Sequence, residues 1–168
     1  MKGRKVLDAE AIDIICLRMS YQAEEQFSGH SKLAVIGVEG EGTHLAKKLA
    51  DLLSARKAFD VQLHTISLPK HKTIRPEVKL SPGPEGLKGV PVLLVDDVLN
   101  SGRTLTYCLS PLLEFEIPSL KIAVLVERTY RKFPVSSSIT GLALSTTIEQ
   151  NVEARLSGSA SETGVFLN

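Results

Sequence analysis

The stretch VLLVDDVLNSGRTL, from Val92 to Leu105, limits the folds open to this chain more than any other part of its sequence. Four apolar residues lead directly into two adjacent carboxylates, Asp96 and Asp97, and a small turn that contains glycine follows. Two neighbouring carboxylates repel each other and resist leaving water. A buried strand that ends in this way is expected to bind something at its end, because hydroxyl donors or a cation can stabilise the pair.

The apolar pattern on both sides of this stretch predicts that strands and helices alternate along the chain. The expected elements are a helix over 8–27, a strand over 33–38, a helix over 43–59, a strand over 61–68, a strand over 90–95, a helix over about 104–116 and a strand over 120–127. Strands that are joined through helices pair in parallel. The fold class we predict is therefore α/β, with a doubly wound and mostly parallel sheet in a single domain of 168 residues.

The composition excludes few classes of partner. A formal net charge of +1 neither indicates nor excludes a polyanion, so any anion site must come from local charges and backbone dipoles. The basic N-terminus is not followed by an uninterrupted apolar segment, and no run approaches the length of a membrane span. We therefore expect a cytoplasmic protein without a membrane partner, in which Cys16 and Cys108 are buried and unpaired.

The turn that follows the two aspartates has the opposite chemistry. It consists of Asn100, Ser101, Gly102, Arg103 and Thr104 and leads into the helix expected from about residue 104. The first N–H groups and the positive dipole end of a helix favour a phosphate. Carboxylates on one side and a phosphate cradle on the other match a ribose 5-phosphate. The alternative is an exposed acidic pair beside an ordinary helix cap.

These residues resemble the phosphoribosyl pyrophosphate (PRPP) binding motif of the type I phosphoribosyltransferases. Within that family the chain is most similar to the bifunctional pyrimidine-operon regulators that are also uracil phosphoribosyltransferases, and the similarity extends to residues 34–50 and 120–135. The resemblance implies that Asp96 and Asp97 are catalytic and bind the ribose 2′- and 3′-hydroxyls, while residues 100–104 bind the 5′-phosphate. The implied cofactor is Mg²⁺, held by the two aspartates indirectly, through the ribose or water.

The resemblance also implies a pyrophosphate loop at the end of the strand over 33–38. This loop consists of Val38, Glu39, Gly40, Glu41 and Gly42. Its glycines suit a close approach of the backbone to an anion. Glu41 stands where the regulator group usually carries arginine, so we expect it to repel pyrophosphate and weaken catalysis, unless Mg²⁺ bridges the two or the side chain turns outward.

Two further segments are expected to cover the site. Residues 69–89 contain four prolines and no sustained period, which is typical of a lid loop, and the candidates there for neutralising pyrophosphate are Lys70, Lys72 and Arg75. The resemblance implies a small hood over about 127–150, with 151–168 as a hairpin or a tail. It also implies that the base meets Val126, Glu127, Arg128 and Thr129.

The predicted function is transfer of ribose 5-phosphate from PRPP to a nucleobase with release of pyrophosphate. Uracil or another pyrimidine is favoured, because purine enzymes of the hypoxanthine-guanine type place a carboxylate where this chain has Asn100. Relatives of this kind are commonly dimeric or larger, so we also expect a homo-oligomer.

Two alternatives stay open. The first is a catalytically weak, nucleotide-sensing and RNA-binding regulator of the same fold, which Glu41 favours. The charge pattern argues against RNA binding, since Arg128, Arg131 and Lys132 form only one small basic cluster. The second is a receiver-type signalling domain, but its acidic pair would follow the first strand instead of a late one.

Overall fold

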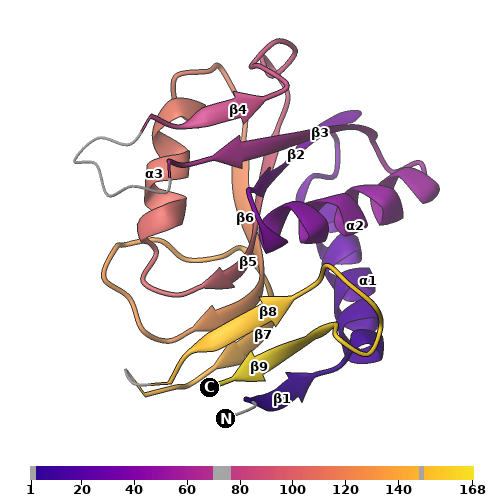
Figure 1. Ribbon diagram of the computed structural model, residues 1–168. Coiled ribbons are helices and arrows are strands. Elements are labelled where there is room, and N and C mark those ends of the chain that lie inside the picture. The colour runs from indigo at the N-terminus through magenta and orange to yellow at the C-terminus, as the bar shows by residue number, and fades with distance from the viewer. Residues whose placement is uncertain (1–2, 70–76, 148–149) are drawn as a thin grey trace.

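The computed structural model describes residues 3–69, 77–147 and 150–168. Its centre is a six-stranded sheet in the order β4-β3-β2-β5-β6-β7 (Figure 1), in which only β4 is antiparallel to its neighbour. The strands are β2 (Lys32–Val38), β3 (Asp60–Ser67), β4 (Lys79–Ser81), β5 (Val92–Leu99), β6 (Leu120–Arg128) and β7 (Ile139–Leu144). The predicted α/β class with a mostly parallel sheet is therefore confirmed.

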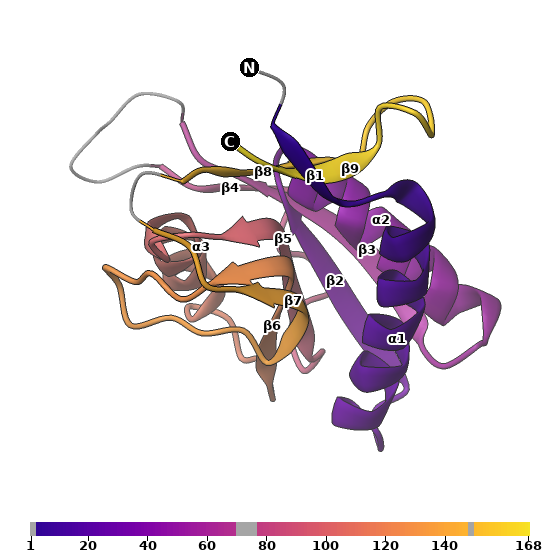
Figure 2. The same ribbon diagram turned by 90° about the horizontal axis from the view of Figure 1, so that it is seen from below.

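Helices cover both faces of this sheet. The helices α1 (Ala9–Gln26) and α2 (Glu41–Ala55) lie on one face, and α3 (Arg103–Leu112) lies on the other (Figure 2). Strand β5 shows why both faces need cover: Leu93 packs in the cluster that includes α1 and α2, while Leu94 packs in the cluster that includes α3. A strand buried on both faces is a continuous apolar run, which is the pattern the sequence shows.

The helix boundaries follow local rules. Asp8 caps α1, since its Oδ1 accepts a hydrogen bond from the Ala11 N–H at 2.8 Å. Helix α3 ends at Leu112, four residues earlier than 116, immediately after Pro111. Pro111 has no N–H to donate in this last turn, and the chain closes after it with shorter contacts, from the Glu114 N–H to the Pro111 carbonyl and from the Phe115 N–H to the Leu112 carbonyl, each at 3.3 Å.

A second, three-stranded antiparallel sheet is built from both ends of the chain. Its order is β1 (Arg4–Leu7), β9 (Gly164–Leu167) and β8 (Val152–Arg155). Residues 151–168 thus form two strands around a turn, and the N-terminal strand, which the sequence pattern did not predict, adds to them. Val152, Ala154 and Val165 pack into the same hydrophobic cluster as α1 and α2.

Parts of the segments expected to form the hood and the lid are strands. Within 127–150, residues 139–144 form β7, which extends the main sheet in parallel with β6. Within 69–89, β4 pairs with β3, and Leu87 is buried. Pairing with β3 therefore fixes residues 79–81 of the segment that was expected to form a loop.

Both cysteines are free and buried. Burial raises the pKa of the Cys16 thiol to about 11 and that of Cys108 to about 12, so both stay protonated at neutral pH. No helix in the described part of the chain has the length and apolar character to cross a membrane.

Candidate active site

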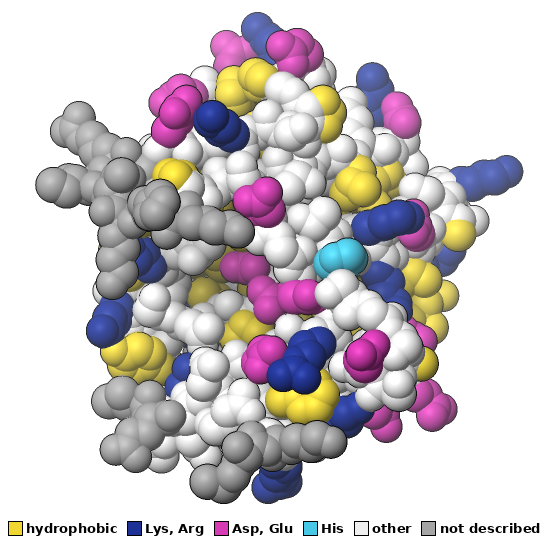
Figure 3. Space-filling view, viewed as in Figure 1, with side chains coloured by type: hydrophobic (Ala, Val, Ile, Leu, Met, Phe, Trp, Pro, Cys, Tyr) yellow, Lys and Arg dark blue, Asp and Glu magenta, His cyan; other side chains and the backbone are white. Residues whose placement is uncertain are grey.

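The carboxyl ends of β2 and β5 lie side by side and place the two sequence motifs together. The strands pair in parallel, with Ala34 opposite Val92 and Gly37 opposite Val95. Each strand is followed by a short loop and a helix, α2 after β2 and α3 after β5. Ligands of open α/β sheets bind at such an edge, because the loops diverge there. Acidic side chains gather near the centre of the face that Figure 3 shows.

Gly42 and Asp96 bring the two motifs into close approach. A Cβ atom added to Gly42 would lie 3.1 Å from Asp96 Oδ1 and 3.2 Å from its Cα. A residue without a side chain suits such an approach. The expected pyrophosphate loop therefore lies directly against the acidic pair, although 54 residues separate Gly42 from Asp96 in the chain.

The two aspartates have different environments. Asp96 is 8% exposed, and its Oδ1 accepts a hydrogen bond from the Asp97 N–H at 2.9 Å. Burial, together with the neighbouring charge of Asp97, raises the pKa of Asp96 well above its ordinary value. Asp97 is only half-buried. Asp97 is therefore the more accessible of the two side chains, whereas burial works against a charge on Asp96.

The loop that follows the aspartates encloses a small cavity at the start of α3. The cavity has a volume of about 60 Å³ and is lined by Asp96, Val98, Leu99, Asn100, Ser101, Gly102, Arg103, Thr104 and Leu105. Gly102 begins the helix in the left-handed region, at φ 84°, and has no side chain to cap it. The Arg103 N–H lies 3.4 Å from Ser101 Oγ, a long contact that leaves the positive end of the helix able to attract an anion.

The expected pyrophosphate loop begins α2 in the same way. Gly40 precedes the helix and provides no side-chain cap, while Thr43 Oγ1 donates to the Val38 carbonyl at 3.2 Å. Glu39 is exposed, and its N–H donates to the Ile66 carbonyl at 2.9 Å. Two helix N-termini without side-chain caps thus begin beside the aspartates.

Glu41 does not act as a free carboxylate in this loop. It accepts hydrogen bonds from the Leu156 N–H, from the Ser157 N–H at 3.1 Å and from Ser157 Oγ at 2.7 Å. Burial works to raise the pKa of Glu41, but these donors together lower it below its usual value. The side chain is therefore directed to Leu156 and Ser157, in the turn after β8.

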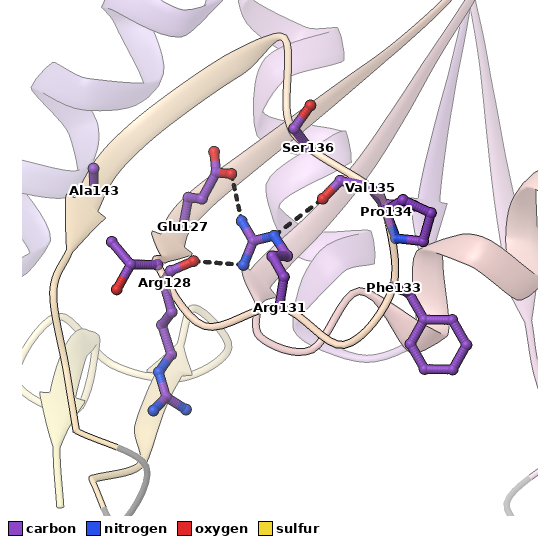
Figure 4. Close-up of a pocket in the computed structure, with 9 residues that line it drawn as sticks. Glu127, Arg128, Arg131, Phe133, Pro134, Val135, Ser136 and Ala143 are labelled. Atoms are coloured by element: carbon purple, nitrogen blue, oxygen red, sulfur yellow. Dashed lines mark hydrogen bonds and ion pairs between the residues drawn. The ribbon is translucent and has the colours of Figure 1, made fainter.

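The segment expected to meet the base is largely occupied by contacts within the protein. Glu127 accepts hydrogen bonds from Arg131, Ser137 and Thr140, and although burial works to raise its pKa, these donors lower it. Figure 4 shows Glu127 and Arg131 pointing toward each other at one side of a cavity of about 460 Å³. The cavity is lined by Glu127, Arg128, Thr129, Arg131, Phe133, Pro134, Val135, Ser136 and Ala143.

The other residues of that segment have separate environments. Val126 is buried in the sheet, and Thr129 is exposed, with its N–H donating to the Leu144 carbonyl at 3.2 Å. Arg128 is buried and bonds to Asn100. The lid candidates Lys70, Lys72 and Arg75 lie outside the described residues.

Sequence comparison decides the family. The profile of the family described as "Phosphoribosyl transferase domain" matches residues 3–156. The chain belongs to the phosphoribosyltransferase family. The resemblance seen in the sequence is thereby confirmed.

The relatives of this phosphoribosyltransferase fall into two groups. Bifunctional protein PyrR from Listeria monocytogenes is 30% identical over 161 residues, covering 90% of this chain and 88% of the relative. Bifunctional protein PyrR 1 from Lactiplantibacillus plantarum is 29% identical, covering 92% of this chain and 91% of the relative. Among solved structures, a hypoxanthine-guanine phosphoribosyltransferase from Bacillus anthracis has a TM-score of 0.78 at 19% identity, covering 100% of this chain and 99% of its own. At this identity the likeness shows the fold alone.

Some site contacts of the phosphoribosyltransferase were not predicted from the sequence. Arg131 was noted only as part of a basic cluster, yet its Nη1 donates to the Asn100 carbonyl at 2.8 Å. Thr146 and Thr147 had no assigned role, yet both accept hydrogen bonds from Arg128. No local pattern marks these residues, because each partner lies on a different element.

Proposed function

We propose that this phosphoribosyltransferase transfers ribose 5-phosphate from PRPP to a pyrimidine base, with uracil as the first candidate, and releases pyrophosphate. The observation that carries the proposal is the contact of Gly42 with Asp96. It puts two uncapped helix N-termini next to an acidic pair, which matches a ligand that has phosphates at both ends and a hydroxylated sugar between them.

Each part of the site has a role in this reaction. Asp97 accepts hydrogen bonds from the ribose hydroxyls, and Asp96 holds the Asp97 backbone by accepting a hydrogen bond from its N–H. The 5′-phosphate occupies the cavity formed by residues 100–104, where main-chain amides and the α3 dipole favour it. Pyrophosphate lies against residues 38–42 at the start of α2.

The chemistry depends on position and electrostatics. The bond between C1 of the sugar and the pyrophosphate oxygen breaks, the electron pair leaves with pyrophosphate, and a ring nitrogen of the base forms the new bond to C1. Positive charge develops on the sugar as this happens, and fixed groups that meet developing charge lower the barrier. The carboxylate of Asp97 lies on the sugar side, whereas the bonded carboxylate of Glu41 is kept from opposing the leaving group.

The residues at the site fit a magnesium ion that arrives with the substrate. Among the described residues there is no group of three or more His, Cys, Asp or Glu side chains that could hold a metal. Mg²⁺ is commonly bound by one or two carboxylates together with substrate phosphates, and Asp97 can supply such a carboxylate. When bound, the ion would neutralise charge on the departing pyrophosphate.

The choice of a pyrimidine rests on two supports. Residue 100 is an asparagine, where purine enzymes of the hypoxanthine-guanine type carry a carboxylate. The sequence relatives named above are PyrR proteins, and they cover most of the chain. The hypoxanthine-guanine enzyme among the solved structures is only 19% identical to this chain, so its likeness shows a common fold and does not favour a purine.

The test is pyrophosphate release from PRPP and Mg²⁺ with uracil, orotate, cytosine, hypoxanthine, guanine and adenine offered separately. Release with uracil and its absence in the Asp97→Asn variant are the expected results. Release with a purine alone would contradict the pyrimidine assignment.

The word "Bifunctional" in the names of the PyrR relatives favours a second activity for this protein as well. RNA binding is the second activity that the sequence resemblance suggests. No release with any base, together with nucleotide-dependent binding of RNA, would favour the regulator over the enzyme. The hydrogen bonds that direct Glu41 to Leu156 and Ser157 support the enzyme over the catalytically weak regulator.

A further inference from the structure

Arg131 lies at the centre of the loop that follows β6. Its Nε donates to the Val135 carbonyl at 3.0 Å and its Nη1 to the Tyr130 carbonyl at 2.9 Å, so the loop closes around the guanidinium (Figure 4). Its Nη2 donates to the Glu127 carboxylate, and the two side chains are only 22% and 21% exposed. A guanidinium carries donors along its whole planar fork. Arg131 therefore fixes the shape of residues 128–135.

Arg131 also reaches the loop that follows β5. Its Nη1 donates to the Asn100 carbonyl at 2.8 Å. The next carbonyl of this loop, that of Ser101, accepts hydrogen bonds from the N–H groups of Lys132 and Phe133, both at 3.0 Å. Two successive carbonyls are thus bonded to three successive residues of the segment after β6. Arg131 itself does not line the cavity assigned to the 5′-phosphate.

These contacts determine which way two amides of the loop point. The peptide bonds between residues 100 and 102 are trans, and in a trans peptide the carbonyl and the next N–H point in opposite directions. Because the Asn100 and Ser101 carbonyls face residues 131–133, the N–H groups of Ser101 and Gly102 point away from that segment. Within the described ranges neither N–H donates a hydrogen bond to another group of the chain. Both residues line the cavity at the start of α3.

We infer that Arg131 is a positioning residue for the 5′-phosphate, because it holds residues 100–102 with the Ser101 and Gly102 N–H groups turned toward the phosphate cavity. The inference rests on the proposed function and deepens it, since phosphate affinity then depends on an arginine that does not touch the phosphate. Amides that are already oriented lose little freedom when the ligand binds. A charged donor holds a carbonyl more strongly than a neutral one, and Glu127 keeps that donor in place.

The test compares the two phosphate subsites of the proposed active site. Calorimetry measures the binding of ribose 5-phosphate, which is assigned to the loop after β5, and of pyrophosphate with Mg²⁺, which is assigned to residues 38–42. Arg131→Gln is expected to weaken ribose 5-phosphate binding by about tenfold or more, while the affinity for pyrophosphate stays within about twofold. Equal losses for both ligands would indicate a general structural role and overturn the inference. An unchanged affinity for ribose 5-phosphate would overturn it as well.

Arg56→Gln is the matched control. Arg56 is also 22% exposed, forms an ion pair with Glu24 and donates to Ser20 Oγ at 3.1 Å. It follows α2 at the opposite end of that helix from residues 38–42. Both arginine variants are expected to lose stability in urea denaturation, but Arg56→Gln should keep its affinity for ribose 5-phosphate within about twofold. The same loss of affinity in both variants would attribute it to reduced stability and overturn the inference.

A conservative variant covers the case in which Arg131→Gln does not fold. Arg131→Lys keeps a charge for Glu127, but a single ammonium group cannot also hold the Asn100 and Val135 carbonyls. It is expected to weaken ribose 5-phosphate binding by about threefold or more and to leave pyrophosphate binding unchanged. An affinity for ribose 5-phosphate equal to that of the wild type would overturn the inference.

The free protein separates the inference from the proposed function. A wild type that does not bind ribose 5-phosphate would contradict the proposed function. The Ser101 and Gly102 amide signals in NMR spectra of the ligand-free protein then decide the inference. They are expected to shift in the Arg131 variant and to stay in place in Arg56→Gln, and unchanged signals in the Arg131 variant would overturn it.

Discussion

Glu41, the first residue of α2, is bonded to Ser157, 116 residues later in the chain. Its carboxylate accepts hydrogen bonds from both the N–H and the hydroxyl of Ser157. The small sheet formed by the chain ends is thereby attached to the loop expected to bind pyrophosphate. An acid that looks unfavourable for catalysis in the sequence has a structural role in the fold.

Glu41→Gln is expected to destabilise the protein. The amide is neutral and has one oxygen, so all three donors on Leu156 and Ser157 lose a charged partner and at least one of them faces the NH₂ group instead. We expect a loss of about 1–3 kcal/mol in the free energy of unfolding, measured by urea denaturation. Glu39→Gln is the matched control, since Glu39 is exposed. Equal stability of both variants would contradict the role assigned to Glu41.

Glu41→Arg is not expected to tighten pyrophosphate binding. The wild-type carboxylate keeps its charge but is directed to Leu156 and Ser157, so we expect its replacement to change the affinity for pyrophosphate by less than about tenfold. Calorimetric titration with pyrophosphate and Mg²⁺ measures this directly. An affinity increase of tenfold or more would show that Glu41 faces the ligand in solution.

Stability is expected to fall on the acid side because of Glu41 and Glu127. Hydrogen bonds lower the pKa of both carboxyls below the ordinary value of 4.5. Their contribution is therefore present above about 4.5 and is lost as the pH falls through their folded pKa values. Thermal melts across this range should show a shallower acid-side loss in Glu41→Gln than in the wild type. Parallel curves would contradict the assignment.

Asp96→Asn is expected to show the opposite dependence. Burial and the nearby Asp97 raise the pKa of Asp96, so its favourable contribution is complete below the ordinary value of 3.8 and is lost as the pH rises through the folded pKa. Asparagine is neutral throughout and keeps an oxygen for the Asp97 N–H. The variant should therefore melt at a higher temperature than the wild type near neutral pH, and this gain should disappear in acid.

Asp97→Asn is expected to abolish PRPP affinity while leaving the thermal melt largely unchanged. Asp97 is half-buried and its side chain forms no ion pair among the described residues, so its charge serves the ligand more than the fold. Calorimetry with PRPP and Mg²⁺ measures the affinity. A loss of stability as large as the loss of binding would indicate a structural acidic pair.

Gly42→Ala is expected to damage both stability and binding. The added methyl group would lie 3.1 Å from Asp96 Oδ1 and 3.2 Å from its Cα, a tight contact that requires Asp96 or the start of α2 to move slightly. We expect a cost of about 1–3 kcal/mol in unfolding free energy, with weaker PRPP binding. Ser54→Ala, at an exposed position of α2, is the control and should be neutral, because alanine suits a helix well.

Much of the fold and part of the site could be predicted from contiguous residues. The apolar runs of β2 and β5, the cap at Asp8 and the turn at Gly102 depend on neighbours within a few positions. The parallel sheet followed from the alternation of these elements, and the order of the motifs placed both loops at one edge. Secondary-structure propensity and the spacing of apolar residues are enough to predict these features, so no contact between distant residues has to be known.

The sequence by itself determined the class of fold, the position of the acidic pair and the glycine-containing turn that follows it. Only the tertiary structure decided that Glu41 bonds to Ser157, that Arg128 bonds to Asn100 and that β1 pairs with β9. Each of these contacts joins residues on separate elements, and which distant partner a side chain meets is set by how the layers pack. The physical reason is that the conformation of a strand or turn depends mainly on neighbouring residues in the chain. A buried polar or charged side chain instead forms hydrogen bonds with whichever donors or acceptors the packing of the elements places next to it.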